Sequence, residues 1–133
     1  MTKLLQNRII LWSGISGALA VALGALGAHK IVPMVSEAHG HAFTTATQYH
    51  MFHSLALLAL AALSDKINER WLRISFLAFL AGIVCFSGSL YLLSTREITG
   101  LAGLMWLGPV TPLGGLMLIT GWLCLVLGVR RTS

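Results

Sequence analysis

The stretch QYHMFHSLALL, residues 48–58, places two histidines and a tyrosine at the head of a run that is otherwise as apolar as a membrane span. A polar side chain in hydrocarbon is costly unless it finds a hydrogen-bond partner. The stretch therefore predicts a helix that crosses a membrane and turns one face towards other helices. The rest of the sequence indicates which segments supply that face with partners.

The chain has the composition of a membrane protein. Its 133 residues are 56% apolar and only 10% charged, with a mean hydropathy of +0.83, outside the range of ordinary soluble domains. A membrane-spanning helix needs about 20 apolar residues. Four intervals without Asp, Glu, Lys or Arg are long enough: residues 9–29, 38–64, 74–95 and 98–129. The predicted fold class is all-α integral membrane, a four-transmembrane-helix bundle.

Local signals set the expected bounds of these helices. Ser36 and Glu37 are typical of a helix start, a cap followed by an acid in the first turn. Thr111 and Pro112 predict another start, because threonine can cap a helix and proline suits its first position. We expect one domain, residues 1–133, with helices at about 9–28, 37–64, 71–93 and 112–129 and an outer-face segment at 98–111. The first interval exceeds the about 7–15 apolar residues of a signal-peptide core, so we expect a mature helix there.

Small residues form stripes on the first and last helices. The first contains SGISGALAVALGALGAH, residues 13–29, and the last has Gly114, Gly121 and Gly128 at seven-residue intervals. Small residues at such spacing let helix backbones approach closely in lipid, where the hydrophobic effect between helices is absent. The stripes predict packing seams, and any seam left over would suit a homo-oligomer.

Basic residues indicate the orientation. Seven of the nine Lys and Arg residues lie at the amino terminus, in the connection at 65–73 or at the carboxyl terminus. By the positive-inside rule, we expect a multi-pass protein of the bacterial inner (plasma) membrane with both termini cytoplasmic. The net charge of +5 is accounted for by contact with anionic membrane lipids at the span ends, so nucleic acid is not an expected partner.

Three histidines share one face of the second predicted helix. Its heptad seam consists of His39, Phe43, Ala46, His50, His53, Leu57, Leu60 and Ser64. If this helix leaves the membrane near Ser64, the helical rise places His53 about 16 Å and His50 about 21 Å from that end. His53 is thus expected near the midplane and is the better-supported position.

Depth counted in the same way brings polar side chains from all four helices to the outer half of the membrane. The motif FSGSLY, residues 86–91, occupies the outer half of the third helix, and the outer connections begin or end nearby. Neutral imidazole donates one hydrogen bond and accepts one, so hydroxyl groups are suitable partners. The candidate ligand-binding site or polar network consists of His29, Tyr49, His50, His53, Ser87, Ser89, Tyr91 and Thr111.

Several interpretations of this cluster stay open. It could be a polar network that fixes helix register, or a site for a lipid headgroup, quinone or other small amphiphile. Haem is a further alternative, although His50 and His53 lie on the same side of one helix, whereas bis-histidine ligation needs opposed nitrogens. Glu37, His39 and His41 could hold a divalent ion near the surface. We expect no cofactor and no metal.

Enzymatic chemistry has no support in the sequence. Motifs for hydrolytic triads, zinc proteases or phosphate-binding loops do not occur, and the predicted spans contain no carboxylate. Cys85 and Cys124 fall at different depths, which argues against a disulfide.

Four blocks of the sequence resemble a known family. They are GALGAH at 24–29, FTTATQYHMFHSLALL at 43–58, FSGSLYLL at 86–93 and GPVTPLGGLMLITGW at 108–122. In this order they resemble the small bacterial inner-membrane proteins of domain of unknown function 423, whose mitochondrial relatives are of the transmembrane protein 256 type. The resemblance implies a four-helix membrane protein and carries no enzyme activity, cofactor or ligand. The matching motif positions are Gly27, His29, Tyr49, His53, Ser87, Gly88, Ser89, Tyr91, Thr111, Pro112, Gly114, Gly115 and Trp122.

The sequence therefore predicts a non-enzymatic integral membrane protein. Its outer-leaflet polar pocket would bind a lipid or other amphiphile, or would stabilise partners or the envelope. The alternative is a redox accessory protein whose histidines contact haem or quinone.

Overall fold

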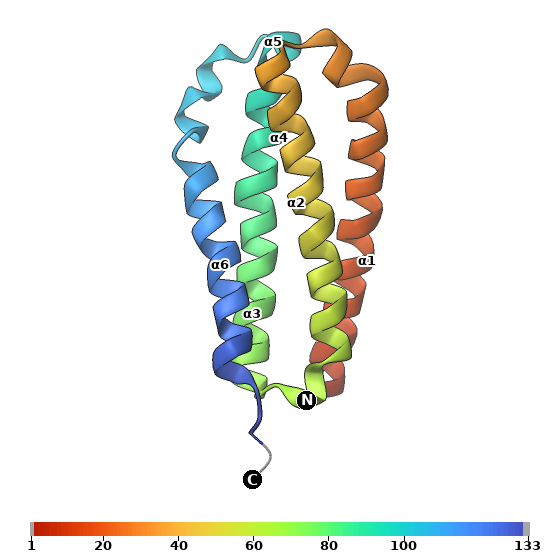
Figure 1. Ribbon diagram of the computed structural model, residues 1–133, viewed down its shortest axis with the longest axis vertical. Helices are drawn as coiled ribbons and strands as arrows, with labels where there is room; N and C mark the ends of the chain where they lie inside the picture. Colours follow the sequence, from red (N-terminus) through yellow and green to blue (C-terminus); the bar gives the residue numbers. More distant parts are fainter. Residues whose placement is uncertain (1, 132–133) are drawn as a thin grey trace.

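Long helices that alternate in direction lie side by side in the computed structural model, which describes residues 2–131 (Figure 1). They are α1 (Thr2–Leu26), α2 (Glu37–Ala62), α3 (Glu69–Gly82) and α6 (Val110–Gly128). Two of these helices are extended by π-helical turns. α1 continues through η1 (Gly27–Ile31) into the 3-10 turn η2 (Val32–Met34), and α3 continues through η4 (Ile83–Gly88) into α4 (Ser89–Ser94).

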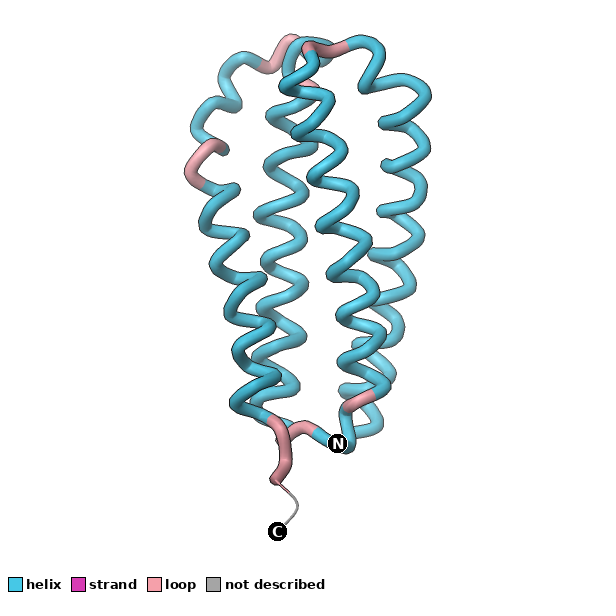
Figure 2. The backbone as a smooth tube through the Cα atoms, viewed as in Figure 1, coloured by secondary structure: helices cyan, strands magenta, loops and turns pink. Residues whose placement is uncertain are grey.

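Short elements connect the long helices at their ends. η3 (Ser64–Lys66) joins α2 to α3, while α5 (Arg96–Thr99) and η5 (Ala102–Leu107) lead from α4 to α6. Figure 2 shows that the loops of the described chain lie at the ends of the helices and at a short break before α6. The described residues are all helix, turn or short loop, as the fold class predicts.

Among the described residues, three helical segments are long and apolar enough to cross a membrane: Lys3–Met34, Glu69–Ser94 and Gly103–Gly128. α2 has a comparable length of 26 residues, but its first half is rich in polar side chains: Glu37, His39, His41, Thr44, Thr45, Thr47 and Gln48. Its polar content separates it from the other long helices. Around the three apolar segments, large side chains such as Leu11, Leu116 and Val126 are exposed, as on a surface that lipid covers.

The heptad seam of α2 is buried, as its spacing predicts. α2 packs on α1 along its length and on η4 and α4 in its first half. The buried seam positions are Phe43, Ala46, His50, His53, Leu57, Leu60 and Ser64. His39, at the start of the helix, is only half-buried.

The glycine stripe of α6 is a packing seam, as predicted. A methyl group on Gly114 would lie 2.3 Å from the backbone nitrogen of Phe86, and one on Gly121 would lie 2.5 Å from the ring of Phe79. At Gly128 the nearest atom would be Cβ of Trp71, at 2.6 Å. All three glycines therefore let α6 approach α3 and η4 more closely than any residue with a side chain would.

The first helix begins earlier than predicted. α1 starts at Thr2 rather than near Ile9, and Leu5 and Ile9 are buried. In addition, Nε2 of Gln6 donates a hydrogen bond to the Ala61 carbonyl over 2.9 Å. The difference arises because charged residues mark the end of an apolar interval, whereas a helix can continue past them into water.

The predicted cap of the last helix is wrong. α6 begins at Val110, its N-cap is Pro109, and the Thr111 side chain makes no capping bond. The Thr111 hydroxyl instead forms a 2.6 Å hydrogen bond with the Ser89 hydroxyl on α4. By contrast, Ser36 caps α2 as predicted, since its hydroxyl accepts from the His39 backbone nitrogen.

Both termini lie at the same end of the molecule, beside the α2–α3 connection (Figure 1). The backbone nitrogen of Asn68 donates to the Gly128 carbonyl and that of Arg130 to the Lys66 carbonyl, each over 2.8 Å. The basic residues grouped in the sequence are therefore gathered at one end: Lys3, Arg8, Lys66, Arg70, Arg73, Arg130 and Arg131. Lys30 and Arg96 belong to the connections at the opposite end.

Candidate functional site

His50 is the centre of a buried hydrogen-bond chain that joins three helices. Its side chain is 3% exposed. Nδ1 lies 2.9 Å from the hydroxyl of Tyr91 on α4, and Nε2 lies 3.1 Å from the hydroxyl of Ser16 on α1. Ser16 in turn lies 2.6 Å from the hydroxyl of Ser54, one turn after His50.

The direction of each bond in this chain follows from counting hydrogens. Ser54 Oγ donates to the His50 carbonyl over 2.7 Å, since a carbonyl oxygen can only accept. Its single hydrogen is then used, so Ser16 donates to Ser54. Because Ser16 has no second hydrogen, the imidazole donates from Nε2 to Ser16. The neutral ring therefore accepts at Nδ1, and Tyr91 is the donor there.

His53 has a second, separate set of partners. Nε1 of Trp122, on α6, lies 3.1 Å from His53 Nε2, and His53 Nδ1 lies 2.8 Å from the Tyr49 carbonyl. Indole nitrogen can only donate, so Nε2 accepts and the hydrogen of the neutral ring is on Nδ1. The ring also packs against Phe79, with centroids 5.6 Å apart. His53 is 6% exposed and has its full complement of hydrogen bonds.

The remaining predicted hydroxyl groups also join helices. Ser87 donates to the Ala46 carbonyl of α2 over 2.8 Å and is almost completely buried. Ser89 and Thr111 join α4 to the first turn of α6. Ser87 lies in the π-helical turn η4, the same turn whose backbone Gly114 contacts. Wide π turns of this kind often occur at functional sites.

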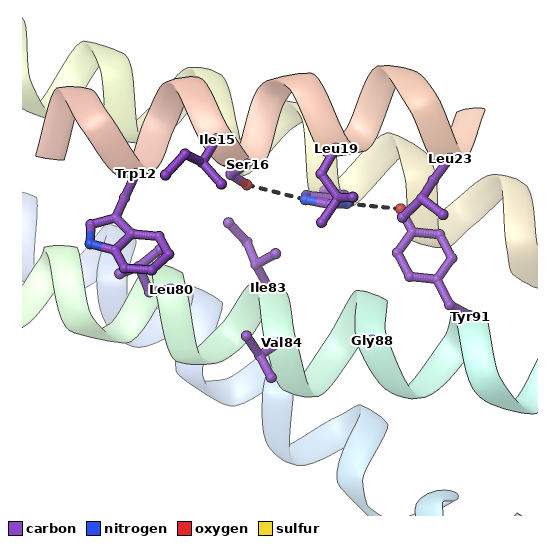
Figure 3. Close-up of a pocket in the computed structure, with 11 residues that line it drawn as sticks. Trp12, Ile15, Ser16, Leu19, Leu23, Leu80, Ile83, Val84, Gly88 and Tyr91 are labelled. Atoms are coloured by element: carbon purple, nitrogen blue, oxygen red, sulfur yellow. Dashed lines mark hydrogen bonds between the residues drawn. The ribbon is translucent and has the colours of Figure 1, made fainter. Parts of the chain in front are cut away.

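A groove of about 280 Å³ opens between α1 and the α3–η4–α4 helix, beside the His50 chain (Figure 3). Its polar groups are the side chains of Ser16, His50 and Tyr91 and the indole N–H of Trp12, and Asp, Glu, Lys and Arg do not occur in its lining. Figure 3 shows Trp12 towards one end of the groove and Tyr91 towards the other. The lining residues are Trp12, Ile15, Ser16, Leu19, Leu23, His50, Leu80, Ile83, Val84, Gly88 and Tyr91.

The structure brings together most of the predicted site residues, in four places. His50 pairs with Tyr91, Ser89 with Thr111, and Ser87 with the α2 backbone. Tyr49 contributes its carbonyl to His53 and its ring to Phe86, at 4.7 Å between centroids, while the side chain is 41% exposed.

The structure does not bring His29 to the other predicted site residues. This residue lies in η1 and is exposed, and among the described residues it has no hydrogen bond to the cluster. It follows α1 near the end away from the termini, but its side chain is exposed and not packed against the cluster. Sequence position gives the depth of a helix residue more directly than it gives the neighbour that the side chain meets.

Sequence reasoning missed three participants. Ser16 and Ser54 were hidden in apolar helices, where serine is common in packing seams. A signal was present, because Ser13, Ser16 and Ala20 fall on one face of α1, and all three are buried. Trp122 was identified only through the family motif, and the partner of its indole nitrogen was not predicted.

The geometry gives little support to a metal or haem ligand set. In the described part of the chain, no three His, Cys, Asp or Glu side chains lie close enough to hold a metal ion. The predicted surface trio is divided: His39 contacts Glu97, while His41 lies 3.8 Å from Glu37. Both ring nitrogens of His50 and of His53 are already hydrogen-bonded. The two cysteines are free thiols.

Comparison with known proteins places the chain in a sequence family. The model of the family described as "Protein of unknown function (DUF423)" matches residues 23–115. A UPF0382 membrane protein of Bacillus subtilis, YwdK, is 38% identical over 92% of this chain and 95% of its own length. A UPF0382 membrane protein of Haemophilus influenzae is 35% identical over 97% of this chain and 98% of its own length. The UPF0382 inner membrane protein YgdD of Escherichia coli is 34% identical over 92% of this chain and 89% of its own length. No solved structure matches the chain.

Proposed function

We propose that this chain, which belongs to the DUF423 family of proteins of unknown function, is a non-enzymatic protein of the bacterial inner membrane that binds an amphiphile in the groove between α1 and α3. The observation that carries the proposal is the groove itself. Its volume of about 280 Å³ is lined mostly by apolar side chains, and one side carries a row of fixed polar groups, Ser16, His50 and Tyr91. The row ends at Tyr91, which makes this the polar end of the groove (Figure 3). Its volume is just below the roughly 300–1,000 Å³ typical of small-molecule sites, which are mostly apolar with a few placed polar groups.

The depth of the groove also favours an amphiphile. Tyr91 lies three residues before the end of α4 at Ser94, a helical rise of about 5 Å, so the polar end is close to the edge of the span. Leu23 lies near Tyr91, and Trp12 is separated from Leu23 by a helical rise of about 16 Å. The groove therefore runs from its Tyr91 end, at the edge of the span, towards the middle of the membrane. A lipid in that leaflet has the same arrangement, with its headgroup at the edge and its chain directed inwards.

The proposal includes four spans with both termini in the cytoplasm. α2 would be the fourth span, because His50 and His53, the polar side chains buried near its middle, are hydrogen-bonded inside the molecule and do not need water. The gathering of seven basic residues at the end with the termini supports a cytoplasmic position for that end. Of the lysines and arginines, the opposite end carries only Lys30 and Arg96, and it would face outwards.

The groove can be filled without disturbing the fold, and this gives the test. Gly88 lines the groove, and a methyl group there would have no atom within 4 Å. Gly88→Leu should fill the channel. Gly14→Leu is a matched control, since Gly14 is also helical with no atom within 4 Å but lies outside the groove.

Each protein would be purified in mild detergent, and its bound lipids would be extracted and identified by mass spectrometry. We expect the wild type and Gly14→Leu to retain one amphiphile in a fixed ratio, and Gly88→Leu to lose it. Equal retention by Gly88→Leu, with an unchanged melting temperature, would refute binding in the groove.

A further inference from the structure

The directions of the hydrogen bonds at the polar end of the groove restrict the chemistry of its occupant. The single hydrogen of the Tyr91 hydroxyl is donated to His50 Nδ1, over 2.9 Å. The hydrogens of Ser16 and of the His50 ring are used within the same chain. No donor of these three residues is therefore left to point into the groove, and the one other N–H group in the lining, the indole of Trp12, lies at the opposite end.

Acceptor capacity, by contrast, is available there. A phenolic oxygen has two lone pairs, and the Tyr91 hydroxyl takes part in only one hydrogen bond, in which it is the donor. Tyr91 lines the groove, and its oxygen lies at the end of the dashed chain in Figure 3. A ligand headgroup at this point can be satisfied only if it brings its own hydrogen.

The absence of charged side chains from the groove lining further restricts which headgroups can bind there. The lining contains no lysine or arginine, and His50 is held as a neutral ring by two partners. Beside Tyr91, a phosphate or carboxylate headgroup would meet neither a cation nor a free hydrogen-bond donor, at a high cost of desolvation. A neutral hydroxyl group meets an acceptor and needs no counter-charge.

We infer that the groove selects a lipid with a neutral, hydroxyl-bearing headgroup, whose O–H donates to the Tyr91 oxygen while the chain extends along α1 towards Trp12. The inference rests on the proposed function, because it assumes that the groove is occupied. Beyond that function, we infer that a hydrogen-bond donor on the headgroup, rather than the length of the lipid chain, determines which lipid binds.

Trp12 makes the test direct. Its ring lines the groove at the end away from Tyr91, so a bromine at the far end of a bound chain should quench its fluorescence. The probe is 11-bromo-1-undecanol, and the matched probe is its methyl ether, which has the same chain but no donor. Both would be titrated into the full-length protein in mild detergent. The Trp12→Phe variant would be titrated in parallel, so that the signal of the other three tryptophans can be subtracted.

We expect the alcohol to quench Trp12 and the ether to require on the order of a five- to tenfold higher concentration, the difference that one hydrogen bond typically makes. The carboxylate 11-bromoundecanoate should be weaker than the alcohol as well. Gly88→Leu should abolish quenching by all three probes, and Gly14→Leu should leave it unchanged.

The other results separate the two proposals. If alcohol and ether quench equally, and Gly88→Leu abolishes both signals, the groove binds amphiphiles but the selection for a donor is refuted. Preference for the ether or the carboxylate refutes it too. If no probe quenches Trp12 above the Trp12→Phe background, both the inference and the proposed function fail.

Discussion

The indole nitrogen of Trp122 donates a hydrogen bond to Nε2 of His53 over 3.1 Å and thereby joins α6 to α2, two helices that share few backbone contacts. The other ring nitrogen of His53 is bonded to the Tyr49 carbonyl of its own helix. A buried acceptor that loses its donor costs more than the bond itself contributes, because it cannot return to water. The Trp122–His53 pair should therefore stabilise the packing of α6 on the rest of the molecule.

Trp122→Phe tests this. Phenylalanine keeps an aromatic ring next to Phe79, whose centroid is 5.3 Å from that of Trp122, but it removes the donor. We expect a loss of about 1–2 kcal/mol in the free energy of unfolding in detergent, measured by denaturant titration. Trp106→Phe is the control, since Trp106 is 66% exposed on η5. A loss no greater than that of the control would show that the His53 bond contributes nothing.

The two buried histidines should be neutral and should exist as opposite tautomers. His50 must carry its hydrogen on Nε2, because Ser16 can only accept there, and His53 must carry it on Nδ1, because Trp122 can only donate. Nitrogen NMR of protein labelled at histidine distinguishes the two forms at neutral pH. The same tautomer in both rings, or a charged ring in either, would contradict the derived hydrogen-bond directions.

The tautomers also show how far the sequence could lead. Seven-residue spacing placed His50 and His53 on a buried face, and the cost of an unpaired polar group in hydrocarbon predicted that hydroxyl groups would meet them. Tyr91 does so. Ser89 and Thr111 pair with each other instead, because the separation between neighbouring helices cannot be read from the depth of their residues.

The sequence was least informative about rotation around helix axes. His29 is exposed, whereas Ser16 bonds to His50 from a run of small residues that looked like a plain packing seam. α1 has apolar residues on most of its surface, so its sequence lacks the polar stripe that would show which side faces inwards. The stripe of Gly114, Gly121 and Gly128 did indicate a packing face, because only glycine permits such close contact.

Gly114→Ala should be strongly destabilising. The added methyl group would lie 2.3 Å from the Phe86 backbone nitrogen, and a backbone atom in a packed helix cannot move aside as a flexible side chain can. We expect a loss of about 1–3 kcal/mol, the usual cost of overpacking. Gly14→Ala, with no neighbour within 4 Å, should be neutral or slightly stabilising because alanine favours helix more than glycine does. Equal thermal midpoints for the two variants would contradict the close approach of α6 to η4.

Glu97, at the end of the molecule opposite the two termini, should make the stability of the protein dependent on pH. Partial desolvation raises the pKa of this carboxyl, but hydrogen bonds from Ser36 and the contact with His39 outweigh it, so the pKa is lowered overall. A carboxyl whose pKa is lower in the folded protein stabilises the fold above its ordinary pKa of about 4.3, and this stabilisation is lost as the pH falls through the folded value. The contacts of Glu97 with Ser36 and His39 join the α1–α2 connection to α5.

Glu97→Gln should therefore lower the thermal midpoint at pH 7 and make the midpoint change less than in the wild type as the pH falls from 7 through the ordinary carboxyl pKa of about 4.3 to about pH 3. Glu37→Gln is the control, because the Glu37 side chain is 93% exposed. Parallel pH curves for the wild type and Glu97→Gln would show that the contacts of Glu97 do not contribute to stability.

The orientation of the molecule can be tested with cysteine labels. The native thiols Cys85 and Cys124 lie within the apolar segments, so both would be replaced by serine and a single cysteine introduced at Thr2, at Arg131 or at Lys30. If the basic end faces the cytoplasm, a membrane-impermeant maleimide added to intact cells should label only the variant at Lys30, and lysis should expose the other two. If α2 did not cross the membrane, the chain would cross it three times. An odd number of crossings leaves the two termini on opposite sides. Labelling of just one terminus in intact cells would therefore refute four spans, whereas labelling of both termini and not of position 30 would keep four spans and reverse the orientation.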